Sequence, residues 1–227
     1  KMTNPNLIKL AQRLGNEELP RERTIEQVQT KVPTSLEGIN LENYVFMPQH
    51  NLYVAKERSH FNKNWFDAHK ALHQENARML TLREFIDFLI LLKNGNAEFK
   101  TLYNEITEVR DPYRAEWIDA DFKVANDKIY MNYNHKIFSG EVKAQSSDKL
   151  EKCLMEDCKV DLMSFNRQGL PTKKGNDFSY WYPRSDNNSV ASFCANAAWA
   201  GLNCIRSPQI SLSDLGVFAC AEGTSKN

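Results

Sequence analysis

The chain lacks an excess of either charge, a long apolar run and a CxxC motif, and each absence excludes a class of protein. Its 227 residues hold 29 Lys and Arg against 29 Asp and Glu, so the formal net charge is zero. Nucleic-acid-binding domains normally carry a basic excess, and that class is disfavoured. The longest apolar runs, such as Phe88–Leu92, are far shorter than the roughly 20 residues that cross a bilayer. The missing CxxC argues against a cysteine-based zinc site.

Cysteines are few, widely spaced and odd in number: Cys153, Cys158, Cys194, Cys204 and Cys220. This usage is typical of reduced thiols in a cytoplasmic protein, although a disulfide among the last three stays open. The first residues contain no apolar stretch of the kind found in signal peptides. We therefore expect synthesis in the cytoplasm without a signal peptide, and no insertion into a membrane.

Charge is scarce toward the C-terminus. Residues 175–227 hold only seven charged side chains, and between Gly175 and Ala221 there is no Lys, no Glu and no Met. Because disordered segments favour Lys and Glu, this composition predicts a packed region of strands and loops. The chain as a whole is predicted to consist of an N-terminal arm or helical extension at 1–40 and one α+β domain at 41–227.

The periodicity of apolar residues predicts the elements upstream of this region. Helices are expected at 64–80, 81–94, 97–109 and 150–165, and a short strand at 44–48. The second helix begins with a capping-box pattern, Thr81 and Glu84. Alternation over 114–124, a turn at 126–127 and a returning strand at 128–137 predict a β-hairpin.

Two groups of side chains have the types that metal binding or acid–base chemistry needs, and each has a simpler interpretation. His69 and His73 share a face of a predicted helix, as metal ligands do, but an exposed histidine pair is the favoured interpretation. Asp119 and Asp121, with Glu116 nearby, share a strand face and offer a carboxylate pair. We interpret them as a solvated strand face. No metal and no cofactor is therefore assigned.

A cysteine nucleophile is the third possibility. Cys194 or Cys204 becomes a candidate only if a histidine approaches it in space, and buried structural cysteines are the favoured interpretation. The sequence contains no P-loop, GxGxxG, GxSxG or kinase signature. We assign no catalytic residue.

Two sets of residues alternate along the C-terminal region. One set has no common chemical character: Cys194, Asn196, Ala198, Gly201, Asn203, Ile205, Ser207, Ile210, Leu212 and Asp214. The other set includes the large packing residues Phe193, Trp199, Leu202 and Leu215. Because alternate side chains of a strand point to opposite faces, we predict that the first set faces outward and binds ligand. The second set is then a buried framework.

Four short motifs carry a resemblance to a known family. They are YWYPR at 180–184, SVA at 189–191, WAGL at 199–202 and LGVFACA at 215–221. Together they resemble the C-terminal region of variable proteins from diversity-generating retroelements, and the archaeal and archaeal-virus branch is most similar. The resemblance implies a C-type lectin fold of the formylglycine-generating-enzyme subtype, with a mixed sheet, packed helices and a variable ligand-binding tail at 186–221.

The same resemblance implies how the tail varies. Template adenines in Asn codons are randomised in that family, and the resulting codons cannot specify Lys, Glu, Gln, Met or Trp. The absence of Lys, Glu and Met from the tail agrees with this, and Trp199 and Gln209 are then fixed framework. No calcium and no catalytic cysteine pair is carried over, because the matching residues are not in the tail.

The expected function is that of a non-enzymatic, variable ligand-binding protein. Its partner would be a protein or glycan on a target cell, as in host recognition by a viral protein displayed on a virion, and its oligomeric state stays open. Two alternatives remain at this point. One is an enzyme related to formylglycine-generating enzymes that uses a tail cysteine, and the other is a purely structural virion protein.

Overall fold

The structure, a computed structural model, describes residues 40–185 and 188–223. The chain divides into two units, Lys1–Val32 and Pro33–Asn227, and all the described residues belong to the second. The arm expected at 1–40 lies outside the described residues, except for Asn40. That residue caps a short 3-10 turn by accepting a hydrogen bond from the backbone N–H of Glu42 at 3.1 Å.

Three α-helices and two sheets make up the described part, which confirms the α+β class. The helical elements are η1 (Leu41–Asn43), α2 (Trp65–Gln74), α3 (Leu82–Asn94) and α4 (Ala97–Thr107). Each α-helix starts at a residue whose side-chain oxygen accepts the backbone N–H three positions on: Asn64, Thr81 and Asn96. The predicted capping box of Thr81 and Glu84 is present. None of these helices is long and apolar enough to cross a membrane.

Two predicted helices differ from the structure. The helix expected at 64–80 ends at Gln74, because Asn76 adopts a left-handed φ of 54° and the chain continues into a strand. The helix expected at 150–165 does not form. There the carboxylate of Asp161 accepts the backbone N–H of Met163 and the hydroxyl of Ser164, and these local bonds favour a turn over a helix.

The strands form a smaller and a larger sheet. They are β1 (Tyr44–Met47), β2 (Leu52–Ala55), β3 (Arg78–Met79), β4 (Arg114–Ala125), β5 (Lys128–Phe138), β6 (Glu141–Lys149), β7 (Cys158–Val160), β8 (Phe178–Trp181), β9 (Ser189–Ala195), β10 (Ala200–Arg206), β11 (Leu215–Gly216) and β12 (Ala219–Glu222). The smaller sheet has the order β1-β2-β12-β3. The larger has the order β6-β5-β4-β9-β10-β8-β7, and β11 pairs with β4. The low-charge C-terminal region therefore supplies strands to both sheets.

The predicted hairpin is confirmed as β4 and β5. Its turn residues, Asn126 and Asp127, both have positive φ, 51° and 56°, as a tight two-residue hairpin turn requires. The register runs from Ala125 opposite Lys128 to Asp121 opposite Asn132. This register fixes which side chains of the two strands become neighbours.

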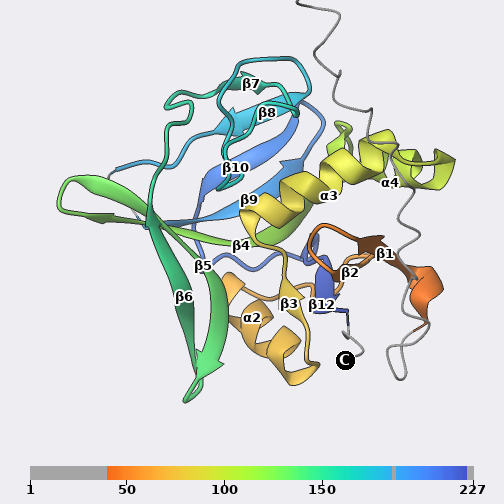
Figure 1. Cartoon of the computed structure of the whole chain (residues 1–227), viewed down its shortest axis with the longest axis horizontal. Helices are drawn as coiled ribbons and strands as arrows, with labels where there is room; N and C mark the ends of the chain where they lie inside the picture. The colour runs from red at the N-terminus through yellow and green to blue at the C-terminus, as the bar shows by residue number, and fades with distance from the viewer. Residues whose placement is uncertain (1–39, 186–187, 224–227) are drawn as a thin grey trace, which may run out of the picture. The chain divides into compact units, whose positions relative to one another are not determined.

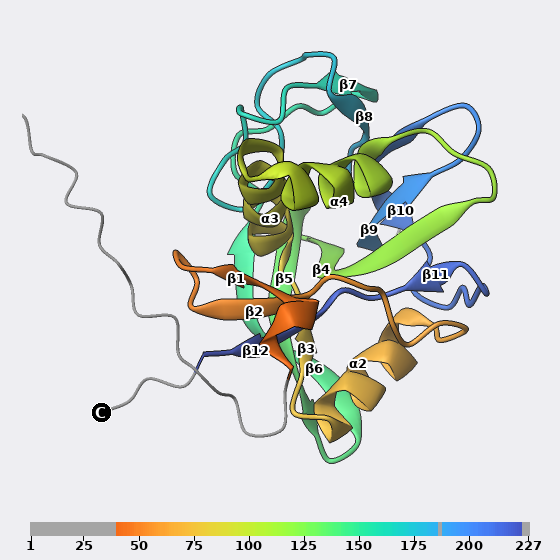
Figure 2. The ribbon, with the colours of Figure 1, turned by 90° about the vertical axis from the view of Figure 1, so that its right-hand side faces the viewer.

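Helices cover both faces of the middle of the larger sheet. Figure 1 shows α3 lying across β4 and β9, and Figure 2 shows α4 beside α3. Phe85 of α3 packs against Phe193 of β9 with ring centroids 5.6 Å apart, in one core cluster. On the opposite face, Trp65 of α2 belongs to a second cluster with Trp117 and Leu215.

Because both faces are covered, residues 114–122 of β4 are buried without alternation. Glu116 and Asp119 are each 1% exposed, and Asp121 is 9% exposed. The expectation that these carboxylates form a solvated strand face is therefore wrong. Alternation along a strand predicts a solvent-exposed face only where no other element packs on that face of the sheet.

Candidate functional site

The ten residues predicted to bind ligand differ widely in exposure. Cys194 and Gly201 are buried, Asn196, Asn203, Ile205, Ile210 and Asp214 are half-buried, and Ala198, Ser207 and Leu212 are exposed. The expectation that all ten face solvent is thus wrong for Cys194 and Gly201. The exposed and half-buried positions remain available to a ligand.

Gly201 is buried because two strands approach closely at this point. It lies opposite Ser179 of the parallel neighbour β8. A Cβ at position 201 would stand 2.1 Å from the carbonyl oxygen of Ser179, closer than any real contact. The position accepts no side chain without a shift of backbone, so Gly201 belongs to the framework.

The predicted framework is buried, with one exception. Phe193, Leu202 and Leu215 are each 0% exposed. Trp199 instead is half-buried, and its ring lies 4.3 Å from that of Trp181 between centroids. The turn that presents it is held by Asn196, whose Oδ1 accepts the backbone N–H groups of Ala198 and Trp199 at 2.8 and 2.9 Å.

The side of β8 and β10 that faces away from α3 carries Ser179, Trp181 and Asn203. Together with Trp199 and with Ile205, which lies two residues after Asn203 in β10, they make up five residues that are called the outer face. Asn203 lies opposite Trp181 in the register, so the two side chains share this side of the sheet. All five are half-buried, and each therefore keeps part of its surface open to solvent.

An irregularity in β10 adds a cation beside the outer face. The register between β10 and β9 shifts between Asn203 and Arg206. Such a bulge reverses the alternation of the strand, which would otherwise put Arg206 on the same side as the buried Leu202 and Cys204. Its guanidinium instead donates to Ser192 Oγ and contacts Cys194 Sγ, both at 3.0 Å, and bonds the hydroxyl of Tyr113.

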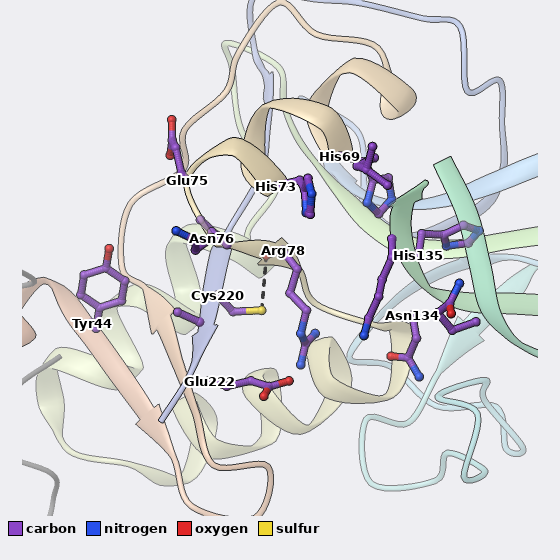
Figure 3. Close-up of a pocket in the computed structure, with 16 residues that line it drawn as sticks. Tyr44, His69, His73, Glu75, Asn76, Arg78, Asn134, His135, Cys220 and Glu222 are labelled. Atoms are coloured by element: carbon purple, nitrogen blue, oxygen red, sulfur yellow. Dashed lines mark hydrogen bonds between the residues drawn. The ribbon is translucent and has the colours of Figure 1, made fainter. Parts of the chain in front are cut away.

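A cavity of about 1070 Å³ lies between α2, β5 and the smaller sheet. Figure 3 shows His69 reaching from α2 toward His135 on β5, with His73 one turn further along the helix. Arg78, Cys220 and Glu222 line the cavity from β3 and β12. Two histidines from separate elements therefore meet at one wall.

Asp119 of β4 lies next to both of these buried histidines. Its Oδ1 accepts a hydrogen bond from His135 Nδ1 at 2.5 Å, and its Oδ2 accepts the backbone N–H of His135 at 3.0 Å. His69 Nε2 lies 3.8 Å from Oδ1 and has no hydrogen-bond partner among the described residues. His69, Asp119 and His135 are 4%, 1% and 8% exposed. We call these three residues the His–Asp–His cluster.

Burial and charge set the protonation of this cluster. Burial lowers the pKa of His69 to about 4, an effect larger than the opposing attraction of Asp119. Burial also acts to raise the pKa of Asp119, but the hydrogen bond from His135 and the proximity of His69 hold that pKa below its ordinary value. At neutral pH the cluster therefore combines a neutral His69 imidazole with an ionised carboxylate.

Trp65 fixes the two imidazoles in place. Its ring centroid lies 4.2 Å from that of His69 and 4.8 Å from that of His135, edge-on in both cases. The indole nitrogen donates to the carbonyl of Ile118 at 3.0 Å, so α2 is anchored to β4 beside Asp119.

Sequence reasoning missed this cluster, although one signal pointed to it. The interpretation of His69 and His73 as an exposed pair is wrong for His69, which is buried, and right for His73, which is exposed. Counting back from the 126–127 turn, the hairpin register places Asp119 opposite Asn134, next along the strand to His135, but regular alternation would turn the His135 side chain to the other face. Asn134 has a φ of 56°, which interrupts the regular strand at this point.

All five cysteines are free, as predicted. Cys194, Cys204 and Cys220 are buried, and Cys153 and Cys158 are half-buried. Comparison of the chain with protein-family models, with curated proteins and with solved structures found no match. The outer face and the His–Asp–His cluster are thus the two candidate sites, one on the sheet surface and one at a cavity wall.

Proposed function

We propose that this protein is a non-enzymatic ligand-binding protein whose outer face recognises a protein or glycan on a target cell. The observation that carries the proposal is the half-exposed pair of Trp181 and Trp199 next to Asn203 and Ile205. Large aromatic side chains dominate binding energy where they sit at the centre of a contact surface. A rigid sheet beneath them holds the contact geometry before the ligand arrives.

The proposal includes variation of the tail by a diversity-generating retroelement. Support comes from the separation between buried framework and accessible positions, since side chains can change at low cost only where little packs on them. We restrict the variable set to accessible positions of the tail: Ala198, Asn203, Ile205, Ser207, Ile210, Leu212 and Asp214. Asn196 is left out because its side chain builds the turn at 196–199.

We further propose that the fold is a C-type lectin fold of the formylglycine-generating-enzyme subtype. The supporting features are a helix pair packed on a mixed sheet and two parallel pairings, β8 with β10 and β4 with β11. The viral setting, with display on a virion and recognition of a host, rests on the motif resemblance. Display in several copies would add avidity to a small contact surface.

The test is a binding measurement on a glycan array and on whole archaeal cells, with the full chain and three variants. Trp181→Ala and Trp199→Ala should each weaken binding about tenfold or more, because an aromatic anchor contributes roughly 2 kcal/mol. Phe138→Ala is the matched control, since Phe138 is an exposed aromatic residue at the end of β5. The proposal would be contradicted if both tryptophan variants bound as tightly as the unaltered chain. It would also be contradicted if the unaltered chain bound no arrayed glycan and no cell.

The alternative of a cysteine enzyme has less support. The Cys204 thiol is buried, and burial raises its pKa well above the ordinary value, so a thiolate nucleophile is disfavoured. Thiol labelling of the native protein separates the two functions. A binding protein should label first at the half-buried Cys153 and Cys158, whereas rapid labelling of Cys194 or Cys204 would favour the enzyme.

A further inference from the structure

We propose that His69, Asp119 and His135 bind one divalent transition-metal ion, with Zn²⁺ as the best fit. The three residues come from α2, β4 and β5, and each offers one ligand atom. These atoms all lie within 4.8 Å of one another. Two imidazole nitrogens and one carboxylate oxygen are a common protein ligand set for zinc.

The separations between the atoms suit a tetrahedral ion. Ligand atoms about 2.0–2.2 Å from a tetrahedral Zn²⁺ lie roughly 3.3 Å from one another. Asp119 Oδ1 lies 2.5 Å from His135 Nδ1 and 3.8 Å from His69 Nε2, so the two observed separations bracket that value. Because no two of the ligand atoms are more than 4.8 Å apart, shifts of about 1 Å in each would bring all three into range.

The unpartnered nitrogen of His69 is the second observation that points to a cation. A buried polar atom without a hydrogen bond is uncommon and calls for a partner. His69 Nε2 is such an atom, and it is directed toward the carboxylate of Asp119. On binding, the proton of His135 Nδ1 moves to Nε2 of the same ring, which frees the Nδ1 lone pair for the metal.

The cavity gives the ion a route to solvent and leaves one coordination position open. His69 and His135 line the cavity, whereas Asp119 lies behind them. Three protein ligands and one open position are typical of zinc sites that also bind water or an anionic group. The ion would link α2 to the β4–β5 hairpin and so stabilise the folded chain.

The experiment measures metal binding by the full chain after EDTA treatment and dialysis. We expect one Zn²⁺ per chain by calorimetry, and a rise in melting temperature of about 5–10 °C at a hundredfold excess over Kd. His69→Gln should weaken Zn²⁺ binding at least a hundredfold. His73→Gln is the matched control on the same helix and cavity, and it should bind Zn²⁺ as the unaltered chain does.

Co²⁺ absorption supplies a measurement that does not depend on a variant that folds. Tetrahedral Co²⁺ bound to imidazole and carboxylate gives visible d–d bands without a thiolate charge-transfer band. A thiolate band, lost in Cys220→Ser, would place the ion on the cavity cysteine and overturn the proposal. No binding of either metal at micromolar concentration, or an equal loss in His73→Gln and His69→Gln, would also overturn it.

Discussion

The outer face and the His–Asp–His cluster lie on the same sheet, yet strand alternation describes one and fails for the other. On β10, Leu202 is buried while its neighbour Asn203 is half-buried, as alternation predicts. On β4, both Ile118 and Asp119 are fully buried. The difference is the covering: α3 packs on one side of β4 and α2 on the other. Alternation therefore reports exposure only at strands with an uncovered face.

The two regions also differ in how they keep polar groups satisfied. On the outer face, Asn203 accepts the backbone N–H of Ile205, two residues further on, and keeps part of its surface open to water. In the buried cluster, Asp119 is satisfied by the ring and backbone N–H groups of His135, whereas His69 Nε2 has no hydrogen-bond partner among the described residues. Substitutions should consequently cost little on the outer face and much in the cluster or the core beneath.

The largest expected effect is at the framework. Phe193→Ala removes a ring that packs against Phe85 and Phe178, and it should lower the free energy of unfolding by about 3–5 kcal/mol. Leu212→Ala is the control, and it should change stability by less than about 0.5 kcal/mol because Leu212 is 41% exposed. Urea unfolding of both variants measures the difference. Similar losses of unfolding free energy in the two variants would contradict the distinction between buried framework positions and exposed positions.

The second prediction concerns acid stability. The pKa of His69 is lowered to about 4 in the folded chain, so between its ordinary value of 6.5 and about 4 the unfolded state binds more protons. Stability should therefore fall as the pH drops through this window, by about 3 kcal/mol in total. The lowered pKa of Asp119 adds a loss in the same direction at lower pH.

Unfolding in EDTA at a series of pH values measures this loss. His69→Gln should flatten the profile between pH 6.5 and 4, and His73→Gln should leave it unchanged. An unaltered slope in His69→Gln would mean that His69 is not buried in neutral form.

A smaller effect is expected at Gly201. Gly201→Ala forces a methyl group against the carbonyl of Ser179 and should cost about 1–3 kcal/mol. Ala198→Ser, at an exposed position of the same region, should stay within about 0.5 kcal/mol. Thermal melts of the two variants provide the comparison, and a neutral Gly201→Ala would return this position to the variable set.

The smallest effect is expected at the turn that carries Trp199. Asn196→Ala removes two hydrogen bonds to the backbone and should cost about 1 kcal/mol. Asn196→Asp keeps the acceptor and should recover most of that loss. Equal melting temperatures for the two variants would show that the side chain of Asn196 does not hold the turn.

Much of the fold could be predicted from local patterns. The capping box at Thr81, the turn at 126–127 and the helical spacing in α3 act within a few residues, and the structure has all three. The end of α2 and the turn at Asp161 could not be predicted, because a left-handed Asn and a side-chain-to-backbone bond override apolar spacing.

The candidate sites depend on contacts between distant segments, and these could be predicted only in part. The burial of Asp119 follows from the packing of α2 on β4. At Gly201, the neighbouring strand β8 leaves no room for a side chain, and spacing within β10 does not indicate which strand lies beside it. The side chain of Arg206 lies on the side of the sheet opposite to Leu202 because of a bulge in β10, and the spacing of apolar residues in the sequence does not predict that bulge. The hairpin register was available from the turn, but it pairs Asp119 with Asn134, and the contact of Asp119 with His135 accompanies a positive φ at Asn134 that the sequence pattern does not predict.

The central claim is that the outer face accepts change while the sheet beneath it does not. The most direct test is a displayed library with every amino acid at Phe193, Gly201, Asn203 and Ile205, sorted for resistance to protease. We predict that positions 203 and 205 retain most substitutions in the resistant fraction, and that 193 and 201 retain very few. Equal tolerance at all four positions, or greater tolerance at 193 and 201, would contradict the account.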